Sequence, residues 1–216
     1  MKNERESVAA CKQEWERVMR EIWTGINVRQ LKVLAVGVGE NAASARWLLG
    51  QGANVTAIDK EIEKLKKYKT LGIPLVCCDV NSLVFKDGSF DLCVFSTVLH
   101  EIDPSLHEKI LSKTANLSSR IMIIEHSPRT FYERYEKLWR NAMRQIGKFE
   151  ERRPFSYWKE LVKKCDLKIL ISKRIERKKK LLPKKVSDIS TAISRKWAAD
   201  GVPKKYIEEM RSLSLI

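Results

Sequence analysis

Short runs of apolar residues alternate with stretches of helical spacing over most of this chain. Five runs have the length of a β-strand: 31–36, 55–58, 75–78, 90–96 and 121–124. Continuous apolar runs of this length are typical of strands in a parallel sheet that is covered on both faces. The pattern therefore predicts an α/β fold with a single doubly wound, mostly parallel sheet, helices on both faces and right-handed crossovers.

Apolar residues at helical spacing predict the helices between these strands. They occupy 42–49, 61–70, 104–117, 130–148 and 155–164. The same spacing from Val8 to Trp23 predicts an amphipathic helix that packs at the sheet edge. Near the end of the chain, alternation over 167–175 predicts one more strand, and 187–197 and 204–213 predict short terminal helices.

The length of 216 residues suits one α/β domain with additional helices and is short for two independent cores. We expect an N-terminal helical segment over 1–30 and a core domain over 31–182. A basic, helical C-terminal extension is expected over 183–216.

Two features bear on where the protein works. No run of eighteen apolar residues occurs, and the N-terminus lacks the apolar centre of a signal peptide. Five cysteines have no C-x-x-C spacing, and Cys77, Cys78 and Cys93 fall in strand patterns, which favours buried free thiols in a reducing compartment. These features predict a cytoplasmic protein without a transmembrane segment.

A glycine turn and an acid flank the first predicted crossover. Gly37-Val38-Gly39 follows the first apolar run directly, and Asp59 ends the second. In a βαβ nucleotide site, glycines let the backbone approach the ligand and an acid at this place binds ribose hydroxyls. This arrangement predicts a cofactor that contains adenosine.

The turn alone leaves the cofactor open. Gly37 to Ala42 match the form G-x-G-x-x-A, so an NAD-dependent oxidoreductase is one interpretation. No hydride-transfer motif such as Y-x-x-x-K follows the turn, and the absence of any G-K-[ST] excludes a P-loop hydrolase.

Polar residues also end the later strands, at Asp79, Ser96 and Glu125. The carboxyl ends of parallel strands meet at one edge of a sheet, where ligands bind. We therefore expect these residues to collect beside Gly37 and Asp59.

The formal net charge of +15 is large. It indicates either an anionic partner, such as RNA, a membrane surface or an acidic substrate, or only a highly charged, soluble surface. The stretch Lys173–Lys185 concentrates eight basic residues and is either a solvated turn or a phosphate-binding patch, through which nucleic acid could bind.

The order of motifs downstream of the turn distinguishes the cofactors. The chain reads VLAVGVGEN, then Asp59, then Asp79, then FDLCVFSTVLHEI and finally IMIIEHSP. With this ordered set, residues 30–175 resemble the class I S-adenosylmethionine (SAM)-dependent methyltransferases, particularly the branch of quinone and related small-molecule enzymes. That family reads VLDxGCGxG, with acids after strands two and three and F-D-x-V, then a segment such as LHHI, at strand four.

The resemblance implies SAM as the cofactor. It assigns cofactor binding to the turn, to the ends of strands two and three, and to the end of strand four: Gly37, Val38, Gly39 and Glu40; Asp59 and Lys60; Asp79 and Val80; and Ser96. Asp59 is expected to accept hydrogen bonds from two ribose hydroxyls, and Asp79 one from the adenine amino group.

Two positions depart from the family pattern. Ala35 replaces the acid of strand one, which helps to hold the amino-acid end of SAM, and Asn41 replaces the third glycine. Asn tolerates left-handed geometry, and Glu40 could substitute for the missing acid. A catalytically weak SAM-binding or scaffold subunit is therefore an alternative.

The acceptor side is less defined. His100 and Glu101 follow strand four and are the candidates for a base, while Trp15, His126, Tyr132 and Tyr135 are candidate substrate-side residues. The three histidines show no clustered ligand spacing, so no metal site is predicted.

We expect methyl transfer to a small molecule, because the resemblance lies with that branch and the aromatic helix over 130–148 could cover an apolar pocket. RNA or protein methylation is the alternative that the charge supports. An N-P-P-Y signature is absent after Phe95, which argues against an adenine-directed enzyme.

Overall fold

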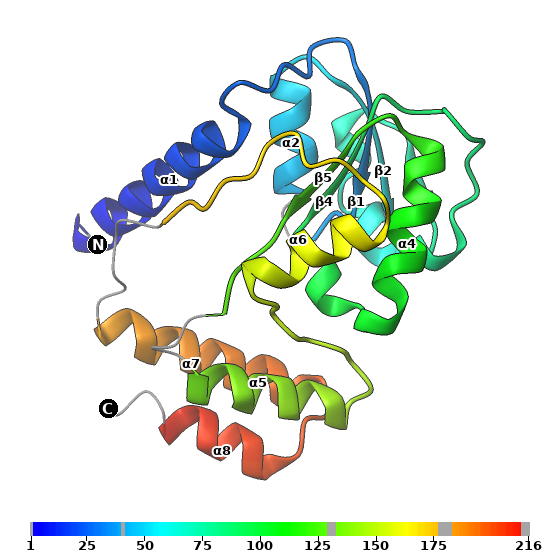
Figure 1. The fold of residues 1–216 in the computed structure, drawn as a ribbon. Helices are drawn as coiled ribbons and strands as arrows, with labels where there is room; N and C mark the ends of the chain where they lie inside the picture. Colours follow the sequence, from blue (N-terminus) through cyan, green and yellow to red (C-terminus); the bar gives the residue numbers. More distant parts are fainter. Residues whose placement is uncertain (1, 40–41, 129–132, 177–182, 213–216) are drawn as a thin grey trace. The chain divides into compact units, whose positions relative to one another are not determined.

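Five parallel strands form one sheet in the order β3-β2-β1-β4-β5 (Figure 1). The computed structural model describes residues 2–39, 42–128, 133–176 and 183–212. The strands span Lys32–Val36 (β1), Asn54–Asp59 (β2), Leu75–Cys77 (β3), Leu92–Ser96 (β4) and Ile121–Ile124 (β5). This arrangement confirms the predicted doubly wound parallel sheet, whose strand order reverses direction between β1 and β4.

The helices lie close to the predicted ranges. They span Lys2–Trp23 (α1), Ala43–Gly50 (α2), Ile62–Lys66 (α3), Pro104–Leu117 (α4), Glu133–Gln145 (α5), Phe155–Lys164 (α6), Pro183–Ala199 (α7) and Lys204–Ser212 (α8). Three short 3-10 turns follow strands or helices, at Lys69–Leu71 (η1), Val80–Ser82 (η2) and Leu99–Glu101 (η3). At the start of α4, Asp103 accepts a hydrogen bond from the Ser105 amide and Pro104 occupies the first turn.

The chain divides into two units, residues 28–168 and residues 1–27 together with 169–216. The first unit contains the whole sheet. One face of the sheet forms a core with α4 and α6, which contribute Ile110, Leu111 and Trp158 against Phe95. Side chains alternate along a strand, so Val33 and Ala35 of β1 supply the opposite face, where α2 contacts β2.

His107 is fully buried beneath α6 in this core. Its Nε2 lies 2.9 Å from the Leu99 carbonyl oxygen and 3.1 Å from that of Ile102, and its Nδ1 lies 2.9 Å from the Tyr157 hydroxyl. Two carbonyl acceptors indicate that Nε2 carries the proton. The side chain thereby ties η3 to α4, and burial lowers the pKa of His107.

The second unit contains α1, α7 and α8. Helices α7 and α8 contact each other, and Trp197 and Met210 are buried there. Lys173 closes the end of α1, because its Nζ lies 3.0 Å from the Glu21 carbonyl oxygen and 2.7 Å from that of Thr24. A cation at this place satisfies carbonyl groups that have no partner within the helix.

Several sequence predictions were wrong in detail. Residues 167–175 contain no strand, because Leu170 interrupts the alternation and both Leu170 and Ile171 are more than half exposed. Cys77 is exposed because β3 lies at the sheet edge and ends at this residue, whereas Cys93 is buried as predicted. Among the residues that the structure describes, no helix is both long and apolar enough to cross a membrane.

Candidate cofactor and acceptor site

The strand ends bring the predicted site residues to one edge of the sheet. The register places the end of β1 beside Ile58 of β2, and Asp59 beside Cys77 of β3. On the other side, Ser96 pairs with Ile124, so Glu125 follows directly beside the end of β4. The gathering of the glycine turn with Asp59, Ser96 and Glu125 at this edge follows from the parallel order.

Asp59 holds the glycine turn in place. Its carboxylate accepts hydrogen bonds from the Val38 amide (Oδ2, 3.1 Å) and from the Glu61 amide (Oδ1, 2.9 Å), and the residue is buried. Each carboxylate oxygen has further acceptor capacity, so ribose hydroxyls can bind the same group. Lys60, the next residue, is exposed.

The two glycines of the turn face different surroundings. Both have left-handed backbones, with φ +76° at Gly37 and +58° at Gly39. A Cβ on Gly37 would lie 2.9 Å from Val98 Cγ2, whereas a Cβ on Gly39 would meet nothing within 4 Å. The space beside Gly39 is therefore open, which leaves room for a ligand next to the turn. Glu40 and Asn41 lie outside the described residues.

This difference predicts unequal effects of alanine at the two glycines. Gly37→Ala should lower the free energy of unfolding by about 2–4 kcal/mol, through left-handed strain and the Val98 clash together. Gly39→Ala should cost only the strain, about 1 kcal/mol. Urea unfolding of both variants measures the difference, and equal losses would contradict the described turn.

Asp79 shapes the loop after β3. Its Oδ1 accepts hydrogen bonds from the Asn81 amide at 2.7 Å and from the Asn81 side chain at 2.8 Å, which caps η2. No described residue hydrogen-bonds to Oδ2, and Asp79 is exposed while Val80 is half-buried. The carboxylate thus keeps a free oxygen for an amino group.

Glu125 organises the segment after β4. Its Oε1 accepts hydrogen bonds from the Val98 amide at 3.0 Å and the Leu99 amide at 2.8 Å, and its Oε2 lies 2.8 Å from His100 Nδ1. The Glu125 side chain is only 3% exposed. The sequence placed Glu125 at this edge but gave it no role, because only the fold shows that one carboxylate binds three groups of the neighbouring strand's loop.

His100 is buried and its pKa is raised. Burial lowers the pKa of His100, but the hydrogen bond and charge of Glu125 outweigh this, helped by Glu150 and Glu101, so the net pKa is raised. Glu150 reaches this place because the Glu151 amide donates a 2.8 Å hydrogen bond to the His100 carbonyl oxygen. Burial is also the main reason that the pKa of Glu150 is raised.

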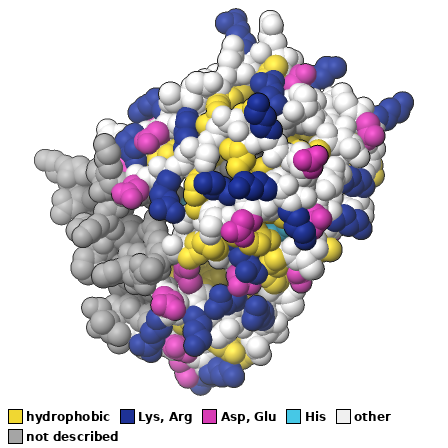
Figure 2. All heavy atoms as spheres, in the orientation of Figure 1, with side chains coloured by type: hydrophobic (Ala, Val, Ile, Leu, Met, Phe, Trp, Pro, Cys, Tyr) yellow, Lys and Arg dark blue, Asp and Glu magenta, His cyan; other side chains and the backbone are white. Residues whose placement is uncertain are grey.

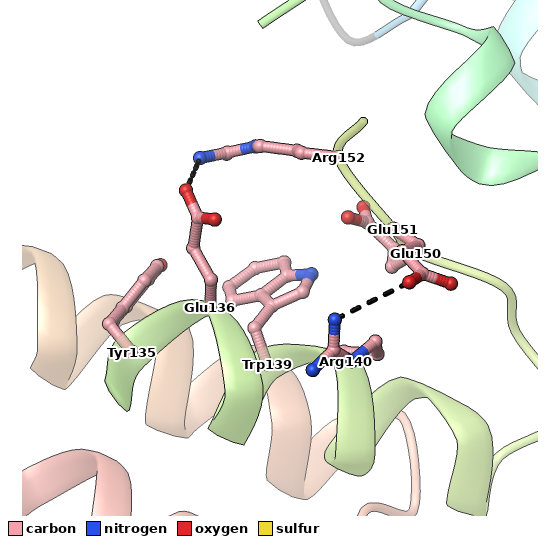
Figure 3. A pocket seen from close by; sticks show the side chains of 7 residues that line it. All are labelled: Tyr135, Glu136, Trp139, Arg140, Glu150, Glu151 and Arg152. Carbon is pink, nitrogen blue, oxygen red and sulfur yellow. Dashed lines mark hydrogen bonds and ion pairs between the residues drawn. The ribbon is translucent and has the colours of Figure 1, made fainter. Parts of the chain in front are cut away.

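A small hollow lies between α5 and the segment that follows it (Figure 3). Tyr135, Glu136, Trp139 and Arg140 line it from α5, and Glu150, Glu151 and Arg152 line it from the segment. Its free volume of about 30 Å³ holds a water molecule rather than a substrate.

The substrate-side candidates do not all meet in this hollow. Tyr135 lies there beside Trp139, with ring centroids 5.9 Å apart, and burial raises the pKa of Tyr135 to about 12. His126 is exposed after β5, and Tyr132 lies outside the described residues. Trp15 belongs to α1 in the other unit and is 38% exposed.

Ala35, which stands where the family has an acid, is 2% exposed between β2 and β4. The structure therefore supplies no carboxylate from the middle of β1. Among the described residues, the acids of the site are Asp59 at the end of β2, Asp79 after β3 and Glu125 after β5.

A family model described as a methyltransferase domain matches residues 34–117. These residues include β1 to β4, the glycine turn, Asp59, Asp79 and all of α4. No curated protein matches the chain significantly.

Three solved structures illustrate the similarity of fold. The YcgJ protein of Bacillus subtilis has a TM-score of 0.59 at 16% identity, with 88% of this chain and 79% of that chain covered. The SAM-dependent methyltransferase of Mesorhizobium loti has a TM-score of 0.52 at 16% identity, covering 70% and 80% respectively. The 1,6-didemethyltoxoflavin-N1-methyltransferase of Burkholderia thailandensis, solved with its substrate and S-adenosylhomocysteine, has a TM-score of 0.51 at 20% identity, covering 81% and 84%.

Proposed function

We propose that this chain, whose residues 34–117 match a methyltransferase domain, is a class I, SAM-dependent enzyme that transfers a methyl group from SAM to a small-molecule acceptor. The observation that carries the proposal is the turn held by Asp59. Its glycines lie at the carboxyl end of β1, inside the segment that matches the methyltransferase domain.

The proposed SAM site runs along the carboxyl ends of β1, β2 and β3. The open space beside Gly39 receives the methionine part, the Asp59 carboxylate binds the ribose hydroxyls, and the free Oδ2 of Asp79 binds the adenine amino group. Val80 lies beside the adenine ring. Charge-assisted hydrogen bonds donated to these two carboxylates favour an adenosine group with free hydroxyls.

The acceptor is proposed to bind beside Ser96, at the ends of β4 and β5. Methyl transfer from a sulfonium is an in-line displacement: the acceptor atom forms a bond to the methyl carbon as the carbon–sulfur bond breaks, and the electron pair of that bond stays on sulfur. The protein accelerates this step mainly by holding the two reactants in line. Glu125 serves this purpose by fixing the Val98 and Leu99 backbone next to the cofactor edge.

Two observations support a small acceptor. The toxoflavin-precursor methyltransferase of similar fold acts on a small heterocycle by its name. Tyr135 and Trp139 lie on α5, which follows β5, in the place where an aromatic cover over a small ligand was expected.

The surface charge gives less support to an RNA substrate. Figure 2 shows Lys and Arg side chains spread among Asp and Glu on the visible face, without one continuous basic patch. Lys173, from the basic stretch, is engaged with the end of α1.

Labelled SAM distinguishes the acceptor classes. The protein is incubated with SAM carrying a labelled methyl group and a cell extract separated into small molecules, RNA and protein. We expect the label in the small-molecule fraction and its loss with Asp59→Asn. Label in the RNA or protein fraction alone would overturn the small-molecule proposal while leaving the methyltransferase assignment intact.

A further inference from the structure

His100, Glu101 and Glu150 converge beside the proposed acceptor position. One ligand atom from each, a ring nitrogen or a carboxylate oxygen, lies within 4.8 Å of the other two. His100 and Glu101 come from η3 and Glu150 from the segment after α5, so residues far apart in the sequence form this group. No metal site was predicted from the sequence, because these residues do not form a motif of closely spaced metal ligands.

The imidazole is oriented by a carboxylate behind it. Glu125 Oε2 lies 2.8 Å from His100 Nδ1, so Nε2 is the nitrogen that remains for a ligand. No described residue hydrogen-bonds to Nε2, although His100 is only 8% exposed. A carboxylate that holds the second nitrogen of a histidine is a usual companion of metal-binding histidines, because it fixes the tautomer and the ring orientation.

Glu150 and its neighbour Glu151 differ in their ion pairs. Glu151 pairs with Arg140 (3.5 Å), Arg144 (3.7 Å) and Arg153 (3.2 Å). Glu150 has no Lys or Arg nitrogen within ion-pair distance among the described residues, although it lies partly buried beside a second carboxylate, Glu101. Among the described residues, neither carboxylate forms an ion pair with a Lys or Arg side chain, so His100 is the basic group that they share.

The two segments are fixed to each other. The hydrogen bond from the Glu151 amide to the His100 carbonyl joins the backbone on either side of the group. Arg152 bonds Glu136 of α5 at 2.9 Å, which holds the second segment from the other side (Figure 3). The backbone that carries His100 and Glu150 is therefore braced, while the Glu101 side chain is exposed beside it.

We propose that His100, Glu101 and Glu150 bind a divalent transition-metal ion, with Glu125 orienting the histidine. One imidazole and two carboxylates suit Mn²⁺ and Zn²⁺, and three protein ligands leave coordination positions open to solvent or to a bound oxygen atom. The assignment needs no methyl transfer and is independent of the proposed function.

If the proposed function also holds, the ion lies on the acceptor side. It would then hold an acceptor through an oxygen atom and lower the pKa of a hydroxyl group there.

Mn²⁺ titration followed by electron paramagnetic resonance tests the site, because the signal of free Mn²⁺ falls as the ion binds. Mn²⁺ also avoids the exposed Cys77 thiol, which softer ions favour. The full chain without SAM should bind one Mn²⁺, which Zn²⁺ displaces. Glu101→Gln and Glu150→Gln should weaken binding by at least tenfold, and Glu125→Gln by about 10–100-fold.

Glu151→Gln is the matched control, because it removes the adjacent carboxylate that already pairs with arginines. It should leave the Mn²⁺ affinity within about twofold of that of the unaltered chain, less than the effect expected of a ligand or its orienting partner. The proposal is overturned if the unaltered chain binds no Mn²⁺, or if Glu151→Gln weakens binding as much as Glu150→Gln. Unchanged secondary structure by circular dichroism shows that a variant is still folded.

Discussion

Glu125→Ala is expected to lower the free energy of unfolding by about 3 kcal/mol. The substitution leaves the amides of Val98 and Leu99 and the Nδ1 of His100 without their acceptor. Each buried donor that loses its partner costs about 1–3 kcal/mol, and relaxation of the loop recovers part of the sum. Urea unfolding with an unchanged m-value measures the loss.

Glu125→Gln is the control of matched size. Its amide oxygen can still accept hydrogen bonds from the two backbone amides. Its NH₂ group is a donor, so it pairs with His100 Nδ1 only when that nitrogen carries no proton. The expected loss is about 1 kcal/mol. A Glu125→Ala protein as stable as the unaltered chain would show that Glu125 does not organise the segment after β4.

Asp59→Ala is expected to lower the affinity for S-adenosylhomocysteine by about 100-fold or more. Two charge-assisted hydrogen bonds to the ribose are lost, and each contributes about 1.5–3 kcal/mol to binding. A tenfold change in affinity corresponds to about 1.4 kcal/mol. Stability should fall by about 2 kcal/mol as well, because the Val38 and Glu61 amides lose their acceptor.

Asp59→Asn separates the two effects. The amide keeps one accepting oxygen, so only one of the two backbone amides loses its acceptor and the stability loss should be smaller than in Asp59→Ala, while the ribose contact is still weakened. Asp87→Asn, in the exposed turn before β4, is the control for loss of a negative charge and should change neither quantity. Unchanged affinity in both Asp59 variants would mean that this carboxylate does not contact the cofactor.

The sheet could be predicted from the sequence because its strands are continuous apolar runs. Residues 33–36 and 92–95 are buried in the central strands, and exposing them would lose much buried apolar area. Gly37 and Glu125 mark where β1 and β5 end. The segment 167–175 shows the limit of this argument. Its apolar residues alternate only in part, and a strand also needs a partner, which its own sequence does not specify.

The cofactor edge could be predicted for a related reason. Parallel order alone brings Gly37, Asp59 and Asp79 to the same side of the sheet, whatever the packing of the helices. What each carboxylate binds could not be predicted, since the partners of Asp59 depend on the conformation of the turn.

The acceptor side was harder to predict because its parts come from distant segments. Glu125 meets His100 only because β5 pairs with β4, and Glu150 arrives through a single backbone hydrogen bond. Such contacts cannot be predicted from the spacing of residues in the sequence. Lys173 is a similar case: the charge pattern left a solvated turn or a phosphate-binding patch open, and the bonds of its Nζ to carbonyl groups at the end of α1 could not be read from the sequence. Residues 177–182 of the same basic stretch lie outside the described residues.

Calorimetric titration of S-adenosylhomocysteine, with NADH as the comparison ligand, tests the central claim most directly. The account predicts one S-adenosylhomocysteine bound per chain, no heat with NADH, and binding weakened by Asp59→Asn but not by Asp87→Asn. Binding of NADH without S-adenosylhomocysteine, or no binding of either, would contradict a working SAM site at the carboxyl edge of this sheet.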